Sequence, residues 1–221
     1  MISRRSFCES GVACSVAYGV APWSSPRGRD AGAARAANET AGAHFHAVLF
    51  DERFAEAVRF GGAARRRGLP ARAVRGDMTQ LWYHELEPMW RREPRPLAGL
   101  TAYAALFCLE RLARDHQLRV VHHGTHTARA RGAIEHVIRG PWRPDACCAG
   151  GICELGCGGP WPQALAAGLA LQQQHACVGL PPAVGVAPER FRSRGTPRGR
   201  LFEEPLHSWV IAPAARQLER T

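Results

Sequence analysis

Lysine is absent from this 221-residue chain, and all 29 of its basic residues are arginine. The absence excludes a Schiff-base lysine and lysine-bound pyridoxal phosphate, because both need an ε-amino group. It also excludes the lysine of a phosphate-binding P-loop, the ATP-binding lysine of a protein kinase and the lysine base of a Ser-Lys hydrolase. Enzymes that depend on lysine chemistry are therefore removed from consideration.

Several short motifs are missing as well. No two cysteines have C-x-x-C spacing, which excludes the zinc-ribbon, thioredoxin and ferredoxin patterns. There is no H-E-x-x-H helix motif, no G-x-S-x-G serine elbow and no G-x-G-x-x-G turn after a strand. For Cys147, Cys148, Cys153 and Cys157, we consider disulfides, free thiols and metal binding, in that order of preference. Cys108 lies in a helix that we expect to be buried, so its expected role is packing.

The formal net charge of +10 is typical of nucleic-acid-binding proteins, but its distribution argues against that function. The arginines are scattered along the chain, and the single run is Arg65, Arg66 and Arg67. This run falls near the end of a predicted helix, where cations interact favourably with the helix dipole. We therefore do not expect a nucleic-acid partner.

The N-terminal segment has the features of an export signal. Arg4 and Arg5 follow a serine and precede Phe7, as in the twin-arginine consensus, and a short apolar stretch occupies residues 11–23. That stretch is too short and weak to span a bilayer, and no later segment predicts a transmembrane helix. Ala34-Arg35-Ala36 fits a cleavage site, with Ala31-Gly32-Ala33 as an alternative. We predict a signal peptide over residues 1–36, the twin-arginine (Tat) translocase as partner, and a periplasmic or secreted location. The alternative is a cytoplasmic tail with a chance arginine pair.

The remaining chain, residues 37–221, is expected to form a single α/β domain. Apolar runs that end in polar residues predict strands, and longer periodic segments that end in glycine or proline predict helices. This order favours an open, mostly parallel sheet with helices on both of its faces, a three-layer arrangement. A regular core is predicted over residues 46–140, an irregular Cys-, Gly- and Pro-rich part over 140–205, and a final strand over 208–212. The expected strands are 47–50, 71–75, 118–121 and 208–212, and the expected helices are 53–67, 78–90, 99–116 and 163–175.

Polar side chains follow the first three predicted strands. In open parallel sheets, ligands bind beyond the carboxyl ends of the strands. Arginine provides two parallel hydrogen bonds to a carboxylate or phosphate, and a helix start offers free N–H groups. We therefore predict a site for a small anionic ligand, walled by Trp82 and Tyr83; the alternative is that these polar residues only cap and turn the chain. The predicted ligand-binding residues are Asp51, Arg53, Asp77, Thr79, Thr101 and His122.

Three histidines after the third predicted strand suggest a second possibility. His122, His123 and His126 could bind a divalent metal ion, with Asp51 or Asp77 as a carboxylate ligand. Successive strand residues point to opposite faces, so His122 and His123 share a site only if the strand has already ended. Ordinary hydrogen-bonded histidines are the favoured interpretation.

Five segments and the two chain ends resemble uncharacterised proteobacterial proteins that carry twin-arginine signals. The resemblance implies export and brings no known activity, and the cysteine-rich insert near Cys147 is not part of it. The segments are Asp51-Glu52-Arg53, Gly76-Asp77-Met78-Thr79, Leu81-Trp82-Tyr83, Ala98-Gly99-Leu100-Thr101 and Leu106-Phe107-Cys108-Leu109-Glu110, together with the terminal Ser208-Trp209-Val210-Ile211-Ala212-Pro213.

The sequence is compatible with three functions. The leading hypothesis is an exported α/β protein that binds a small anionic ligand at its strand ends, as an accessory to a secreted redox system. The first alternative is a metal-assisted or acid–base enzyme, hydrolase-like, that uses histidine and aspartate at the strand ends. The second alternative is a non-catalytic partner or chaperone of another exported protein.

Overall fold

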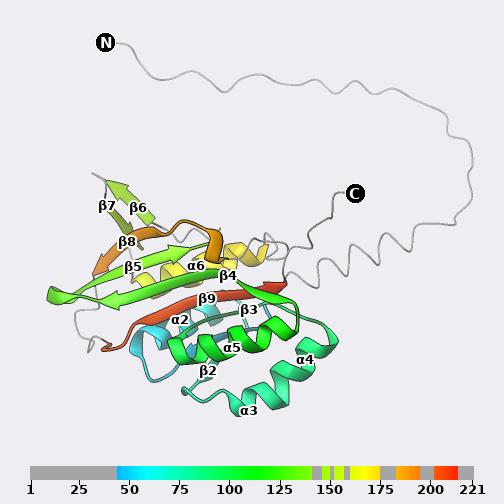
Figure 1. The fold of residues 1–221 in the computed structure, drawn as a ribbon. Coiled ribbons are helices and arrows are strands. Elements are labelled where there is room, and N and C mark those ends of the chain that lie inside the picture. The colour runs from blue at the N-terminus through cyan, green and yellow to red at the C-terminus, as the bar shows by residue number, and fades with distance from the viewer. Residues whose placement is uncertain are drawn as a thin grey trace, which may run out of the picture.

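The structure is a computed structural model, shown in Figure 1, and it describes residues 44–140, 146–149, 152–156, 160–174, 183–194 and 202–213. The predicted signal peptide, with Arg4 and Arg5, lies outside the described residues, as does Cys157. No helix within the described residues is long and apolar enough to cross a membrane.

Strands and helices alternate along the first half of the described chain. The strands are β1 (Ala47–Asp51), β2 (Ala71–Val74), β3 (Leu97–Ala102), β4 (Leu118–Ala128), β5 (Ala133–Arg139), β6 (Ala146–Ala149), β7 (Ile152–Leu155), β8 (Glu189–Arg194) and β9 (Leu206–Pro213). The α-helices are α2 (Ala55–Arg66), α3 (Thr79–Leu81), α4 (Glu87–Arg92), α5 (Tyr103–Asp115) and α6 (Trp161–Gln174). A short π-helix, η1 (Trp82–Leu86), joins α3 to α4, and two short 3₁₀-helices are η2 (Ala130–Gly132) and η3 (Ala183–Gly185).

The described strands form one open sheet in the order β2-β1-β3-β9-β4-β5-β8-β7-β6. The pairs β1–β2, β1–β3 and β7–β8 are parallel, and the other five neighbouring pairs are antiparallel. Six of the nine described strands therefore run in one direction, namely β1, β2, β3, β4, β7 and β8, and the other three, β5, β6 and β9, run in the opposite direction. The predicted fold class is confirmed: an α/β fold with an open sheet whose strands mostly share one direction.

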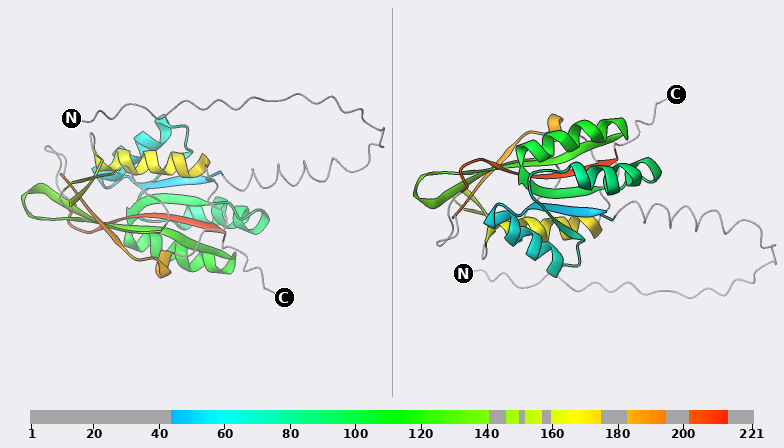
Figure 2. Two further views of the ribbon diagram at one scale, coloured as in Figure 1. Left: turned by 90° about the horizontal axis from the view of Figure 1, so that it is seen from above. Right: turned by 90° about the horizontal axis from the view of Figure 1, so that it is seen from below.

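Helices cover both faces of this sheet, which makes three layers (Figure 2). All five residues of β1 are buried, as expected for a central strand that is covered on both sides. Its alternate side chains supply two separate cores, with Val48 and Phe50 under α2 and α6, and Ala47 and Leu49 under α4 and α5. We call these the α6 face and the α5 face of the sheet.

Two predicted elements have other boundaries in the structure. Residues 97–102 form the buried strand β3, and the helix begins only at Tyr103, although the sequence predicted a helix start at Gly99. A short apolar run does not distinguish a buried strand from a buried helix. The decisive contact is tertiary, because Gly99 lies opposite Trp209 of β9, and a Cβ there would sit 2.5 Å from the indole ring and 2.8 Å from the Leu49 carbonyl oxygen.

The strand expected at 118–121 continues to Ala128. It pairs with β9 on one side and β5 on the other, with a bulge between Val120 and His122. The region expected to be irregular contains β6, β7 and β8 as well as α6. Strand β5 alternates buried and partly exposed residues, because α6 covers one side of it and no described helix covers the other.

Candidate functional site

Asp51 and Arg53 lie at the carboxyl end of β1, as predicted, and bind each other. The Asp51 carboxylate is buried and accepts hydrogen bonds from Arg53 Nε at 2.9 Å, Nη2 at 2.6 Å and the backbone N–H at 3.2 Å. The Arg53 guanidinium lies against Gly76, where a Cβ would be 3.0 Å from Cζ. The arginine that was expected to bind an external anion is therefore already paired with a carboxylate of its own chain.

Asp77, Thr79 and Thr101 also have partners within the chain. The Thr79 backbone N–H donates to Asp77 Oδ1 at 2.8 Å, and this hydrogen bond lowers the pKa of the exposed carboxyl. Thr101 is buried inside β3, accepts a hydrogen bond from Trp209 Nε1 at 3.1 Å and donates to the Ala102 carbonyl at 3.0 Å. The prediction that Thr101 begins a helix with free N–H groups is wrong, because it is a strand residue.

A cavity of about 460 Å³ does lie next to Arg53. The charged side chains among its described lining residues are Arg53, which is paired with Asp51, and the carboxylates of Glu56, Glu203 and Glu204. This charge balance is unfavourable for an anion. It is lined by Arg53, Phe54, Ala55, Glu56, Phe202, Glu203 and Glu204.

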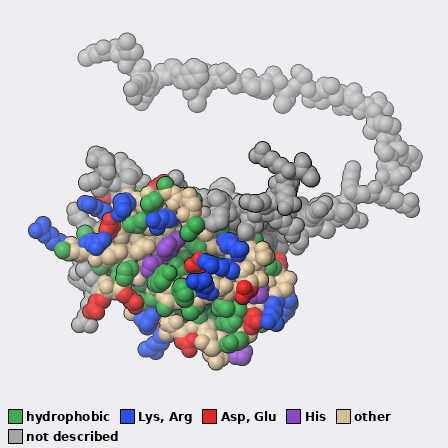
Figure 3. Space-filling model, viewed as in Figure 1, with side chains coloured by type: hydrophobic (Ala, Val, Ile, Leu, Met, Phe, Trp, Pro, Cys, Tyr) green, Lys and Arg blue, Asp and Glu red, His purple; other side chains and the backbone are tan. Residues whose placement is uncertain are grey.

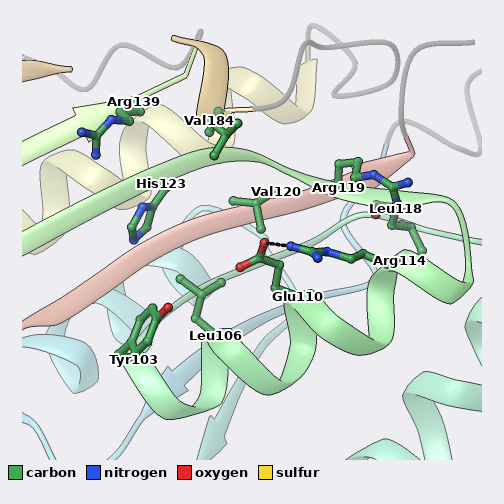
Figure 4. A pocket seen from close by; sticks show the side chains of 11 residues that line it. Tyr103, Leu106, Glu110, Arg114, Leu118, Arg119, Val120, His123, Arg139 and Val184 are labelled. Atoms are coloured by element: carbon green, nitrogen blue, oxygen red, sulfur yellow. Dashed lines mark hydrogen bonds and ion pairs between the residues drawn. The ribbon is translucent and has the colours of Figure 1, made fainter. Parts of the chain in front are cut away.

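A larger cavity of about 710 Å³ lies on the α5 face of the sheet, between α5, β4 and η3 (Figure 4). Apolar side chains from α5 and β4 line it, together with Ala183 and Val184 of η3. In Figure 4, Arg139, His123 and Tyr103 lie on one side of the cavity, and Arg119 and Arg114 lie on the other. We call it the α5 cavity; it is lined by Tyr103, Leu106, Glu110, Arg114, Leu118, Arg119, Val120, His123, Arg139, Ala183 and Val184.

The α5 cavity carries an excess of positive charge. Among the described residues that line it, Glu110 is the one carboxylate, and it accepts a hydrogen bond from Arg114 Nη2 at 2.7 Å. Arg119 donates to the Leu118 carbonyl at 2.8 Å, which leaves its charge uncompensated by that contact. Arg139 forms no ion pair with a carboxylate of the described residues. Figure 3 shows histidine surface flanked by hydrophobic and basic side chains on the face of the molecule that carries α5.

His123 and His207 form a pair at one side of this cavity. Their rings stack with centroids 5.2 Å apart and an interplanar angle of 9°, and His123 Nε2 lies 2.9 Å from His207 Nδ1. The Tyr103 ring lies 5.1 Å from His207. Burial lowers the pKa of His207 to about 4, and burial together with the nearby Arg139 charge lowers the pKa of His123. Both imidazoles are therefore neutral at pH 7, and the positive charge of the cavity comes from arginine.

A second histidine cluster is buried on the α6 face. His126 hydrogen-bonds with Ser208 Oγ at 2.9 Å and with His136 at 2.7 Å, and His136 hydrogen-bonds with Ser193 Oγ at 2.7 Å. Ser208 Oγ is also 3.4 Å from His122 Nε2. We call this series, His122–Ser208–His126–His136–Ser193, the histidine chain; it crosses β4, β9, β5 and β8. Burial lowers the pKa of His136 to about 3 and holds the pKa values of His122 and His126 well below the usual range.

The three histidines predicted as metal ligands do not meet in one place. His122 and His126 belong to the histidine chain on the α6 face, whereas His123 lies on the α5 face next to His207. The strand continues through all three positions, so its side chains keep alternating. In the part of the chain that the structure describes, no group of three His, Cys, Asp or Glu side chains is arranged to hold a metal ion.

Several residues of both clusters were not found from the sequence. Arg139 and His136 belong to β5, whose sequence Ala-Ile-Glu-His-Val-Ile-Arg alternates apolar and polar residues and is a strand pattern in itself. That alternation could have placed His136 on the buried side with Ile134 and Ile138. No local pattern connects His207 or Ser208 with β4, because they are more than 80 residues away in sequence.

The structure describes Cys108 and the backbone of three of the four clustered cysteines, Cys147, Cys148 and Cys153. Cys108 is exposed on α5, so the expectation that it packs in a buried helix is wrong. That helix is amphipathic, and Cys108 lies on its outer side while Leu106 and Leu109 are buried. In the hairpin of β6 and β7, the backbone of Cys148 lies opposite that of Cys153, and Cys147 lies opposite Glu154.

Comparison of the chain with protein-family models, with curated proteins and with solved structures found no match.

Proposed function

We propose that this protein binds a small organic anion in the α5 cavity. The observation that carries the proposal is the charge of the cavity: Arg119 and Arg139 line a space of about 710 Å³, and Glu110, the one carboxylate among its described lining residues, is already paired with Arg114. The ligand class is the one predicted from the sequence, an anion. The position differs, because the cavity beside Arg53 is lined by three glutamates.

The walls of the α5 cavity indicate a ligand with an apolar body. Leu106, Leu118, Val120 and Val184 line the cavity with apolar side chains. Small-molecule sites are concave and mostly apolar, with a few polar groups that orient the ligand. A ligand whose carboxylate or phosphate binds Arg139, and whose hydrocarbon part lies over these side chains, matches both the positive charge and the apolar lining of the cavity.

Calorimetric titration tests this proposal. Small carboxylates and phosphate monoesters with apolar bodies should bind the wild-type protein, and Arg139→Gln should weaken binding about tenfold or more, since a hydrogen bond to a charged group contributes about 1.5–3 kcal/mol. Arg66→Gln is the matched control, because Arg66 is exposed on α2, on the other face of the sheet. Binding that is unchanged in Arg139→Gln, or equally weakened in Arg66→Gln, contradicts the assignment of the site.

The periplasmic or secreted location is part of the same proposal and is supported by Arg4 and Arg5 and the sequence that follows them. In a bacterium with the twin-arginine translocase, the double variant Arg4→Lys, Arg5→Lys should keep the protein in the cytoplasmic fraction. The control is Arg27→Lys with Arg29→Lys, which changes two later arginines of the same segment. Equal export of both variants contradicts the twin-arginine assignment.

The acid–base enzyme remains a second candidate because of the His123–His207 pair. A neutral imidazole beside a bound anion can accept a proton from the ligand, and its partner can transmit the proton along the shared hydrogen bond. If the cavity is catalytic, bound carboxylic acids should exchange an acidic C–H proton with deuterated solvent in the wild type but not in His123→Gln. Exchange at the same rate in both proteins removes this candidate.

A further inference from the structure

Aromatic and imidazole rings lie next to Arg139, and they indicate which kind of anion the cavity binds. His123 and Tyr103 line the α5 cavity, and His207 lies between them, so that consecutive ring centroids are 5.2 and 5.1 Å apart. Phe107 extends the series, with its ring 6.1 Å from Tyr103. We call these four side chains the ring wall. Its imidazoles are neutral because burial disfavours their charged forms, so the ring wall attracts apolar and aromatic groups rather than anions.

The ring wall and the cation lie at the same side of the cavity. Arg139 of β5 lies directly opposite His123 of β4 in the strand register, and Figure 4 shows Arg139, His123 and Tyr103 together on one side. An anionic group on Arg139 therefore places the atoms attached to it against the rings. Tyr103 is 51% exposed, so part of its ring surface is free to contact a ligand.

Resting on the proposed function, we infer that the ligand is an aryl carboxylic acid: its carboxylate binds Arg139, and its aromatic ring packs against His123 and Tyr103. Arginine suits a carboxylate because its planar guanidinium offers two parallel N–H donors. Val184, which also lines the cavity, offers the aromatic group a further apolar contact. The volume of about 710 Å³ exceeds the need of a single ring, so larger aryl acids gain further contact with Leu106 and Val120.

The test compares four probes by calorimetric titration of the intact protein: benzoate, cyclohexanecarboxylate, 2-naphthoate and benzyl alcohol. Benzoate should bind roughly two- to tenfold more tightly than cyclohexanecarboxylate, which is the range expected for aromatic contacts beyond area burial. The bicyclic 2-naphthoate should bind more tightly than benzoate. Benzyl alcohol, which keeps the ring and lacks the charge, should bind at least tenfold more weakly than benzoate.

Two variants separate the ring from the charge. Tyr103→Leu removes an aromatic ring and keeps an apolar side chain, so it should reduce the preference for benzoate over cyclohexanecarboxylate. Arg139→Gln should weaken both carboxylates alike and leave the preference intact. Arg66→Gln, on α2, should change neither, and thermal unfolding of each variant shows whether it remains folded.

The outcomes distinguish the two proposals. If cyclohexanecarboxylate binds as tightly as benzoate, the aryl inference is overturned and anion binding stands. If benzyl alcohol binds as tightly as benzoate, anion binding itself is overturned. If neither carboxylate binds at millimolar concentration, the aryl inference fails, and the wider carboxylate and phosphate series decides the proposed function.

Discussion

His126 and His136 face each other across β4 and β5 with their Nδ1 atoms 2.7 Å apart, and Trp161 of α6 covers both rings at centroid distances of 4.7 and 5.1 Å. When both imidazoles are neutral, one Nδ1–H donates to the other Nδ1, and the outer nitrogens bond with Ser208 and Ser193. A proton added to the acceptor ring puts two N–H groups against each other, and a proton added to the donor ring places a positive charge on a fully buried side chain. The pair therefore requires both rings to be neutral.

This requirement predicts that acid destabilises the fold. The pKa of His136 falls from 6.5 to about 3 on burial, so the unfolded chain binds a proton at a pH where the folded chain does not. Stability is complete above pH 6.5 and decreases as pH falls toward the folded pKa, by about 1.4 kcal/mol per pH unit for such a histidine. Urea unfolding should show a loss of about 2–3 kcal/mol from His136 between pH 6.5 and 4.5.

The matched variants for this effect are His136→Gln and His84→Gln. His84 is exposed in η1, so its replacement should leave both the stability and the pH slope unchanged. His136→Gln removes the titrating group and should flatten the slope, while lowering stability at pH 7 by about 1–3 kcal/mol through the lost buried hydrogen bonds. An unchanged slope in His136→Gln contradicts the assignment.

Gly124 makes room for the histidine chain, which predicts a strong effect of adding one methyl group. A Cβ at this position would overlap Ser208 Oγ and lie 3.2 Å from His126 Nε2. Gly124→Ala should therefore separate His126 from Ser208 and cost about 1–3 kcal/mol in urea unfolding. Gly62→Ala is the control, because the nearest atom there is a flexible Arg66 terminus at 3.6 Å and alanine favours the helix. A Gly124→Ala variant as stable as wild type contradicts the packing described.

A substitution of Thr101 tests whether this residue stabilises the fold or binds the ligand. Its hydroxyl accepts the Trp209 indole N–H in the core, so Thr101→Val should lower stability by about 1–2 kcal/mol. Benzoate affinity should stay unchanged, because Thr101 does not line the α5 cavity. Urea unfolding and calorimetric titration on the same preparation measure both effects. A variant that loses benzoate affinity but keeps its stability would show that Thr101 belongs to the ligand-binding site predicted from the sequence.

The affinity for a carboxylate should be independent of pH from 6.5 to 8. The cation that binds it is arginine, which stays charged, and His123 is neutral over this range because burial and Arg139 lower its pKa. Calorimetric titration with benzoate at three pH values checks this. An affinity that falls tenfold per pH unit above 6.5 would show that imidazolium supplies the charge.

The sequence predicted the fold class because its signals are local. Residues close in sequence are enough to predict the first strand, from the apolar run Ala47-Val48-Leu49-Phe50, and the helix that ends before Gly68. Asp51, Arg53 and Asp77 were also placed correctly at strand ends, since a strand ends where its apolar run ends. The sequence did not predict the hydrogen-bond partners of these residues: Arg53 binds the Asp51 carboxylate instead of an external ligand.

The sequence by itself determined the α/β class, the strand and helix of the first β–α unit, and the absence of lysine chemistry. The tertiary structure decided that β9 inserts between β3 and β4, and with it both clusters. This insertion brings His207 to His123 on one face and Ser208 to His126 on the other, across 84 and 82 residues of chain. Such pairings depend on the register of strands that are distant in sequence, and hydrophobic periodicity specifies which face a residue takes but not which strand lies beside it.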